Sequence, residues 1–325
     1  MFASHQATLA SIARVIKKNS TFFIAGHLKP DGDTVGTALA LASLLSRLKK
    51  KAFVYSKEPV PDYLKFLPGV RSITITEKVT RSFDCAIILE CYNLERMGSL
   101  IDAVQAKTLI NIDHHASFTK FGHINYINSA ASSSAEQLFS LFDHFHLPLT
   151  TKEAICLYTG LVTDTGRFQH SNASPTAHRV AAALIEAGVK PEILYDKIYG
   201  TKSMPALKLL GNALSALTLD CSNRIAYFQI TRSMYRRTSA TPMDTEEIIN
   251  YAVMVPGVVV GILFRENDEP GVIKVSFRSK GDINVSAIAR QFDGGGHRNA
   301  AGCSIAGSIG AVTKKVIAHI CKELK

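Results

Sequence analysis

The sequence predicts an α/β fold in which a mostly parallel sheet, flanked by helices, is followed by a smaller α/β domain at the C-terminus. Two observations predict it. Short, uninterrupted apolar runs alternate with amphipathic stretches over the first half of the chain, which is typical of parallel strands buried on both faces. The length of 325 residues also exceeds what one hydrophobic core usually organises, so two domains are expected.

The first half alternates expected strands with expected helices. Apolar runs predict strands at 22–26, 52–55, 85–89 and 108–112. Amphipathic spacing predicts helices at 36–48, 133–145, 152–162 and 175–187. Residues 1–19 are also expected to form a structural helix, because they lack the apolar segment and the cleavage site of a secretory signal.

The second half predicts a smaller domain with a β-hairpin. Helices are expected at 206–219, 245–253 and 284–292, and strands at 224–230, 258–264 and 272–277. The last two strands flank a turn at 267–271, which is typical of a hairpin. The segment 190–205, which precedes this half, is more polar and is flanked by prolines. We therefore expect a first domain over residues 1–189, a linker over 190–205 and a second domain over 206–325.

Composition narrows the class of protein. The net charge of +10 favours anionic partners such as phosphates or nucleic acid, although a solvated basic surface has the same net charge. No apolar stretch approaches the ~18 residues that a membrane span needs. The six cysteines form no Cys-x-x-Cys pair, so we expect reduced thiols rather than a disulfide framework. A cytoplasmic protein fits this pattern.

Polar side chains gather directly after the first expected strand. His27, Asp31 and Asp33 follow it closely, and Gly32 lets the backbone turn between the two acids. In open α/β sheets, ligands bind at the carboxyl ends of the strands, where this loop is expected. An Asp-Gly pair also occurs in ordinary turns, so this stretch alone leaves a ligand loop and a simple turn equally open.

A second polar cluster follows another expected strand. Asp113, His114 and His115 come directly after the apolar run at 108–112. Two neighbouring strand ends would bring both clusters into one crevice. Mixed histidine and carboxylate ligation suits Mn²⁺, with Mg²⁺, Co²⁺ or Fe²⁺ as alternatives. The sequence therefore predicts a divalent-metal site at this edge of the sheet.

Two further acids have weaker claims on sequence grounds. Asp164 stands where a helical run stops, and Glu90 closes the expected strand at 85–89. A helix end that faces solvent and a surface acid at a strand end are the alternative interpretations.

Four motifs in this order resemble those of the DHH phosphoesterase family. They are His27-x-x-Pro-Asp31-Gly-Asp33, Asp113-His114-His115, Thr163-Asp164-Thr165-Gly166 and the glycine-rich segment 294–302. The resemblance runs from residue 21 to residue 304 and implies two divalent ions, Mn²⁺ first of all, in the larger domain. The ligands that it implies are His27, Asp31, Asp33, His114 and Asp164. It also implies that Asp113 supports an imidazole and that His115 faces the scissile phosphate, as a proton donor or charge stabiliser.

One position departs from the family pattern. The family usually has an aspartate at the end of the strand before the DHH triplet, where this chain has Glu90. We align Glu90 with that bridging metal ligand, because Asp84, the nearby alternative, lies at the wrong end of the strand. A glutamate is longer by one methylene, which leaves the metal preference and spacing open.

The C-terminal motif implies that the second domain binds the part of the substrate that does not contact the metal ions. Gly294, Gly295 and Gly296 let backbone N–H groups approach an anion, and His297 and Arg278 would hold a terminal phosphate. A flexible turn and a solvent-facing arginine are the alternatives. A groove fixed at both ends favours short RNA oligonucleotides, linear dinucleotides or 3′-phosphoadenosine 5′-phosphate. The resemblance also makes a homodimer an expectation.

The expected reaction is in-line attack on phosphorus by a hydroxide that two metals activate, without a protein nucleophile. Two other functions stay open. An inorganic pyrophosphatase or polyphosphatase would use a similar metal cluster, although the resemblance ties the glycine motif to nucleotide substrates. A protein whose metal centre is impaired by Glu90 would bind nucleotides without turnover.

Overall fold

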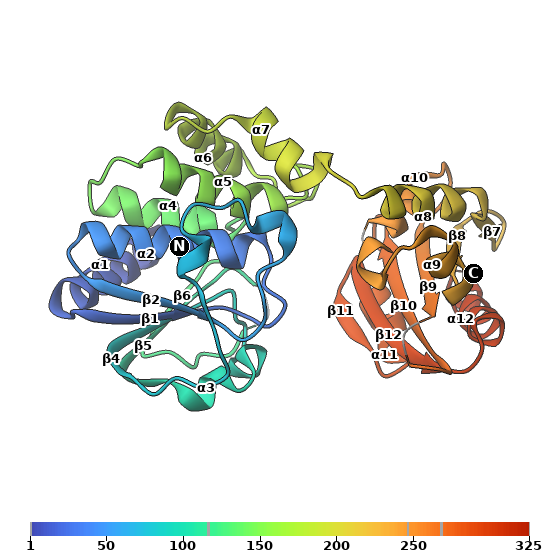
Figure 1. Ribbon diagram of the computed structural model, residues 1–325, viewed down its shortest axis with the longest axis horizontal. Helices are drawn as coiled ribbons and strands as arrows, with labels where there is room; N and C mark the ends of the chain where they lie inside the picture. Colours follow the sequence, from blue (N-terminus) through green and yellow to red (C-terminus); the bar gives the residue numbers. More distant parts are fainter. Residues whose placement is uncertain (1, 116–117, 246, 267–268, 325) are drawn as a thin grey trace. The chain divides into compact units, whose positions relative to one another are not determined.

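The computed structural model describes residues 2–115, 118–245, 247–266 and 269–324, apart from the side chains of residues 2–4, 101, 103 and 297. The chain forms two compact units, Met1–Thr201 and Lys202–Lys325, each with its own sheet (Figure 1). The predicted fold class is confirmed, since a parallel sheet with helices is followed by a smaller α/β unit.

The first unit is built on a six-stranded sheet in which all neighbouring strands are parallel. In spatial order the strands are β3 (Thr74–Ile75), β2 (Lys51–Ser56), β1 (Thr21–Ala25), β4 (Ser82–Leu89), β5 (Gln105–Asp113) and β6 (Ile124–Ile127). Side chains of β1 alternate between two apolar clusters: Phe22 and Ile24 pack in one, and Phe23 and Ala25 in the other. Burial on both faces explains the continuous apolar runs in the sequence.

The first unit also contains helices of two length classes. The longer ones are α1 (Phe2–Lys18), α2 (Gly32–Arg47), α4 (Ser134–His144), α5 (Thr151–Asp164) and α6 (Pro175–Glu186); the shorter ones are η1 (Asp62–Leu64), η2 (Val70–Ser72), η3 (Leu94–Met97), α3 (Leu100–Ala103), α7 (Pro191–Tyr195) and the π-helical turn η4 (Asp196–Gly200). α2 begins at Gly32 rather than at the predicted residue 36, because the Asp31 carboxylate accepts a hydrogen bond from the Thr34 N–H at 2.9 Å. Residues 191–200, which the sequence placed in a linker, form α7 and η4 within the first unit.

The N-terminal segment forms the structural helix that the sequence predicted. In α1, Leu9, Ile12 and Ile16 are buried and join the apolar cluster that contains Phe22. Their spacing places them on one face of the helix. Throughout the described residues, every helix is too short or too polar to cross a lipid bilayer.

The second unit has a mixed sheet of six strands. In spatial order they are β11 (Gly295–His297), β12 (Ala300–Ala306), β10 (Val272–Ser279), β9 (Val260–Glu266), β8 (Ile225–Ile230) and β7 (Thr218–Asp220). Its helices are α8 (Met204–Ser215), α9 (Arg232–Thr238), η5 (Pro242–Thr245), α10 (Ile248–Met254), α11 (Val285–Arg290) and α12 (Ile309–Glu323). β9 and β10 pair antiparallel, as predicted for a hairpin, and residues 267–268 of its turn lie outside the described part of the chain.

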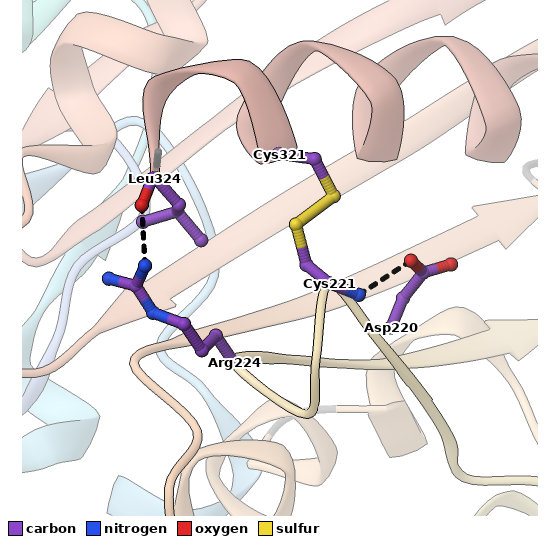
Figure 2. The surroundings of a disulfide bond; sticks show 5 residues. All are labelled: Asp220, Cys221, Arg224, Cys321 and Leu324. Carbon is purple, nitrogen blue, oxygen red and sulfur yellow. Dashed lines mark hydrogen bonds between the residues drawn. A yellow bond between two sulfur atoms is a disulfide. The ribbon is translucent and has the colours of Figure 1, made fainter.

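A disulfide joins an early turn of the second unit to its last helix (Figure 2). Cys221, between β7 and β8, is bonded to Cys321 on α12, and their Cα atoms are 5.7 Å apart. Beside the disulfide, the Arg224 guanidinium donates a hydrogen bond to the Leu324 carbonyl. The prediction of reduced thiols is therefore wrong for this pair. The two cysteines are 100 residues apart in the sequence, so no local pattern records their contact.

Candidate metal centre

The predicted ligand loops meet at one edge of the first sheet. β1, β4 and β5 are neighbours and run parallel, so their carboxyl ends share that edge. His27 follows β1, Glu90 follows β4 directly, and Asp113 is the last residue of β5. Asp164, the last residue of α5, also reaches this edge through its contact with the DHH triplet. Asp84 lies near the opposite end of β4, away from this edge of the sheet.

His114 lies between two acids. Its Nε2 atom is 3.5 Å from Oε2 of Glu90 and 3.4 Å from Oδ2 of Asp164. Its Nδ1 atom lies 3.3 Å from the carbonyl oxygen of Ala131. Nε2 is buried and has no hydrogen-bond partner among the described residues. An imidazole nitrogen facing two carboxylates in this way is a suitable ligand for a divalent cation.

Glu90, which the sequence resemblance aligns with the family's usual aspartate, is buried. Its φ of +59° lies in the left-handed region, which non-glycine residues rarely adopt, and its N–H donates to the Ile112 carbonyl at 3.1 Å. Its carboxylate accepts a hydrogen bond from the Ser134 hydroxyl. Glu90, His114 and His115 each offer a ligand atom, and these atoms lie within 4.8 Å of one another. The backbone therefore adopts an unfavourable conformation at a candidate ligand, a feature common at functional sites.

Asp33 is fully buried in the first turn of α2. Its carboxylate accepts hydrogen bonds from the backbone N–H groups of Ser134 and Ala135, at 2.7 and 3.0 Å, and from the Thr37 hydroxyl at 3.0 Å. The first two donors are backbone N–H groups in the first turn of α4, which have no acceptor within the helix, and this end of a helix favours negative charge. These bonds fix the carboxylate at the edge where the other acids lie.

His27 and Asp31 form a pair beside this cluster. His27 Nε2 is 3.5 Å from Oδ2 of Asp31 and 2.8 Å from the Thr34 hydroxyl, and Nδ1 is 2.6 Å from the Leu28 carbonyl. Burial raises the pKa of Asp31, but its hydrogen bond and charge interaction with His27 outweigh this effect and lower the pKa to about 2. Asp31 is therefore ionised at neutral pH.

His115 and Asp113 form a second pair. His115 Nδ1 is 2.6 Å from Oδ1 of Asp113, while Oδ2 of Asp113 has no hydrogen-bond partner among the described residues. Burial raises the pKa of Asp113, but the hydrogen bond and charge of His115 outweigh it and lower the pKa below its usual range. Asp113 is thus an ionised acid that orients the His115 ring.

The centre holds more negative charge than its buried groups tolerate. Burial, with the charge of Asp33, raises the pKa of Glu90 well above its usual range and that of Asp164 to about 7. Burial likewise raises the pKa of Asp33. Burial lowers the pKa of His114, but the surrounding acids, Glu90 first, outweigh it and raise the pKa to about 11. A divalent cation would offset this charge, so the donor set fits a metal ion.

The glycine motif forms the edge strand of the second sheet. At Gly294, an added Cβ atom would collide with the Gly302 carbonyl; at Gly296, whose φ is +142°, it would lie 2.5 Å from the Ala300 carbonyl. Gly295 has no atom within 4 Å of such a Cβ, so its surroundings are open. Two of the three glycines are therefore required for close packing of β11 on β12.

The strand register of this sheet places two residues that are predicted to bind a phosphate at the same level across neighbouring strands. Arg278 of β10 and His297 of β11 both pair with Ala300 of β12. Arg278 is partly buried, and its guanidinium donates to the Phe277 carbonyl at 3.1 Å. The side chain of His297 lies outside the described residues.

Sequence reasoning missed two side chains that contact the predicted ligands. The Ser134 hydroxyl donates to Glu90, and the Asn172 amide donates to Oδ2 of Asp164 at 3.3 Å. The spacing of Ser133 and Glu136 signals a helix start, and Ser133 caps α4. That this start faces the acids depends on tertiary packing. Nothing in the polar loop around Asn172 distinguishes it from other turns.

Comparison with known proteins identifies the class. A model of the DHH family's N-terminal domain matches residues 21–161, and a model of the DHHA1 domain matches residues 224–325. The chain belongs to the DHH family and is a hydrolase of the phosphoesterase type.

Relatives at the level of individual proteins cover almost the whole chain. The chain is 28% identical to the bifunctional oligoribonuclease and PAP phosphatase NrnA of Thermus thermophilus, over 96% of this chain and 93% of the relative. It is 27% identical to the protein of the same name from Bacillus subtilis, over 90% and 92%. The structure of an exopolyphosphatase-related protein from Bacteroides fragilis matches with a TM-score of 0.91 at 26% identity, over 98% of each chain.

Proposed function

We propose that this phosphoesterase is metal-dependent and cleaves very short RNA oligonucleotides, linear dinucleotides or 3′-phosphoadenosine 5′-phosphate. The observation that carries the proposal is the buried His114 Nε2, which faces Glu90 and Asp164 without a hydrogen-bond partner among the described residues. The activities in the names of the Thermus and Bacillus relatives support the substrate class.

Two divalent ions, Mn²⁺ first of all, are proposed for this centre. The proposed ligands are His27, Asp31, Asp33, Glu90, His114 and Asp164. When bound, such ions act as Lewis acids and lower the pKa of a water molecule enough to make it a nucleophile near neutral pH.

His115 is proposed as the proton donor to the leaving oxygen. Its Nδ1 atom lies 2.6 Å from Oδ1 of Asp113, and this contact orients the ring. A positioned imidazole suits general acid catalysis near neutral pH. Asp113 acts in this proposal through His115, by fixing the ring.

The second unit is proposed to hold the part of the substrate that does not react. Arg278 and His297, in one row of the sheet, would bind a terminal phosphate. Gly295 and Gly296 would offer backbone N–H groups to the same anion, whereas the N–H group of Gly294 donates to the Ala289 carbonyl at 2.9 Å. A grip on a terminal phosphate favours substrates of a few nucleotides.

The test is turnover by the full chain, first treated with chelator and then supplied with Mn²⁺. We expect mononucleotide release from an RNA dinucleotide, phosphate release from 3′-phosphoadenosine 5′-phosphate, or both, only after Mn²⁺ is restored. Pyrophosphate and polyphosphate are the comparison substrates, because the Bacteroides relative is described as exopolyphosphatase-related. Turnover of these alone would favour the polyphosphatase alternative. Nucleotide binding without turnover at any divalent ion would favour an impaired binding protein.

Two further properties are part of the proposal. We infer a cytoplasmic location: the free thiols of Cys85, Cys91, Cys156 and Cys303 support it, and the Cys221–Cys321 disulfide is the feature that departs from it. We also infer a homodimer, from the family resemblance. Light scattering on a size-exclusion column measures the mass of the assembly, and a monomer at working concentration would contradict the dimer.

A further inference from the structure

Three of the proposed ligands contact one short segment, residues 131–135, at the start of α4. The His114 ring lies 3.3 Å from the Ala131 carbonyl, and the Ser134 hydroxyl donates to Glu90. The N–H groups of Ser134 and Ala135 donate to the two oxygens of Asp33. One segment thus contacts ligands from α2, from the end of β4 and from the loop after β5.

Asn172 connects a fourth proposed ligand to the same segment. Its Nδ2 atom lies 3.2 Å from the Asp164 carbonyl oxygen and 3.3 Å from Oδ2 of the same residue. The same atom donates to the Ser132 carbonyl at 2.8 Å. Since one amide group contacts both partners, it fixes the distance between the end of α5 and the start of α4.

The segment is itself held firmly. Ser132 donates twice to one carboxylate oxygen of Glu136, from its N–H at 3.1 Å and from its hydroxyl at 2.6 Å. Ser133 caps the helix by accepting a hydrogen bond from the Glu136 N–H at 3.2 Å. The side chains of Ser132, Ser133 and Ser134 are fully buried. These bonds fix the segment against which the proposed ligands lie.

We propose that Asn172 and Ser134 are positioning residues of the metal centre. Asn172 acts through Asp164, and Ser134 acts through Glu90. Hydrogen-bond partners of metal ligands typically change metal affinity by about 10- to 100-fold when removed. The inference rests on the proposed function, because it presumes that these acids bind a divalent ion.

The experiment is calorimetric titration of the metal-free full chain with Mn²⁺. We expect Asn172→Ala and Ser134→Ala each to raise the Mn²⁺ dissociation constant by about tenfold or more. Asn125→Ala is the matched control, because Asn125 is also partly buried and, among the described residues, its side chain bonds to the nearby Gly122 rather than to a proposed ligand. Its affinity should equal that of the unaltered chain. If Asn172→Ala does not fold, Asn172→Ser, too short to reach Asp164, should show the same defect.

A double-mutant cycle separates positioning from a general structural role. In an Asp164→Asn chain, adding Asn172→Ala should lower the Mn²⁺ affinity less than it does in the unaltered chain, because the carboxylate through which Asn172 acts is already lost while the bond to Ser132 remains. Adding Ser134→Ala to the same chain should keep its full effect. An Asn172→Ala effect of equal size in both backgrounds would overturn the role assigned to Asn172.

The failures of the two proposals are distinguishable. An unaltered chain that binds no Mn²⁺ would contradict the metal centre itself. An unaltered chain that binds Mn²⁺ as tightly as Asn172→Ala and Ser134→Ala do would contradict only the positioning role.

Discussion

Asp164 shows at the scale of one residue how burial shapes a candidate ligand. Its carboxyl group ends α5 close to Asp33 and His114. Burial, with the charge of Asp33 next in importance, raises its pKa to about 7. When a carboxyl group keeps its proton near neutral pH, that proton competes with a metal cation for the same oxygen.

We therefore expect Mn²⁺ binding to weaken as the pH falls. Between pH 8 and pH 6, a group with a pKa of about 7 gains most of its proton, so the protonation of Asp164 by itself should lower the affinity by about tenfold. Titration calorimetry of the metal-free chain across this range measures the effect. Asp164→Asn should bind more weakly and show a flatter pH profile; a profile of equal slope would exclude Asp164 as the titrating group.

Substitution of Glu90 tests the departure from the family's aspartate. Glu90→Gln keeps the size but removes the charge, and should lower Mn²⁺ affinity and turnover by about 100-fold, as loss of a charged ligand implies. Glu90→Asp keeps the charge but is shorter by one methylene, so its Mn²⁺ affinity and turnover should lie between those of the unaltered chain and those of Glu90→Gln. Calorimetry and dinucleotide turnover give the order of the three chains. A Glu90→Gln chain that binds Mn²⁺ normally would remove Glu90 from the ligand set.

At the scale of secondary-structure elements, the ends of strands and helices define the candidate site. The carboxyl ends of β1, β4 and β5 supply the ligand loops, and the start of α4 supplies the donors to Asp33 and Glu90. In the second unit, the disulfide between Cys221 and Cys321 joins the turn before β8 to α12. Because the pair is 100 residues apart, it constrains nearly the whole second unit when that unit unfolds.

Removal of this disulfide should destabilise the second unit. A long closed loop typically contributes about 2–4 kcal/mol to the free energy of unfolding. Cys321→Ser should therefore lower the urea midpoint of the oxidised chain, followed by circular dichroism. With reductant in the buffer, the unaltered chain and Cys321→Ser should unfold alike. A difference that persists under reducing conditions would mean that the substitution acts through packing instead.

At the scale of the whole molecule, function is proposed to divide between the two units. The first carries the candidate metal ligands, and the second carries a row of residues suited to a phosphate. The DHH and DHHA1 family models match these same two parts of the chain. Loss of the phosphate grip should then weaken substrate binding and leave the metal centre intact.

Arg278→Ala tests this division. We expect KM for 3′-phosphoadenosine 5′-phosphate to rise by about tenfold or more, as the loss of a charge-assisted hydrogen bond implies, with Mn²⁺ affinity unchanged. Arg237→Ala is the control, because Arg237 is an exposed arginine on α9 of the same unit, outside the glycine-rich segment 294–302. Equal KM values for the two variants would remove Arg278 from the substrate site.

The sequence by itself determined the fold class and the chemical character of the site. Continuous apolar runs predicted parallel strands, and polar clusters after those runs put His27 and the DHH triplet at strand ends. These are local properties, since periodicity and the residue after a strand are read within a few positions. The assignment of individual ligands stays a prediction that the experiments above address.

Only the tertiary structure decided which distant residues meet. It placed Ser134 and Asn172 against Glu90 and Asp164, and it paired two cysteines that the sequence assigned to reduced thiols. Contacts between segments tens of residues apart depend on strand order and helix packing. No local pattern encodes the contacts of Ser134 and Asn172 or the pairing of the two cysteines. The sequence therefore predicted the types of ligand but not the side chains that hold them in place.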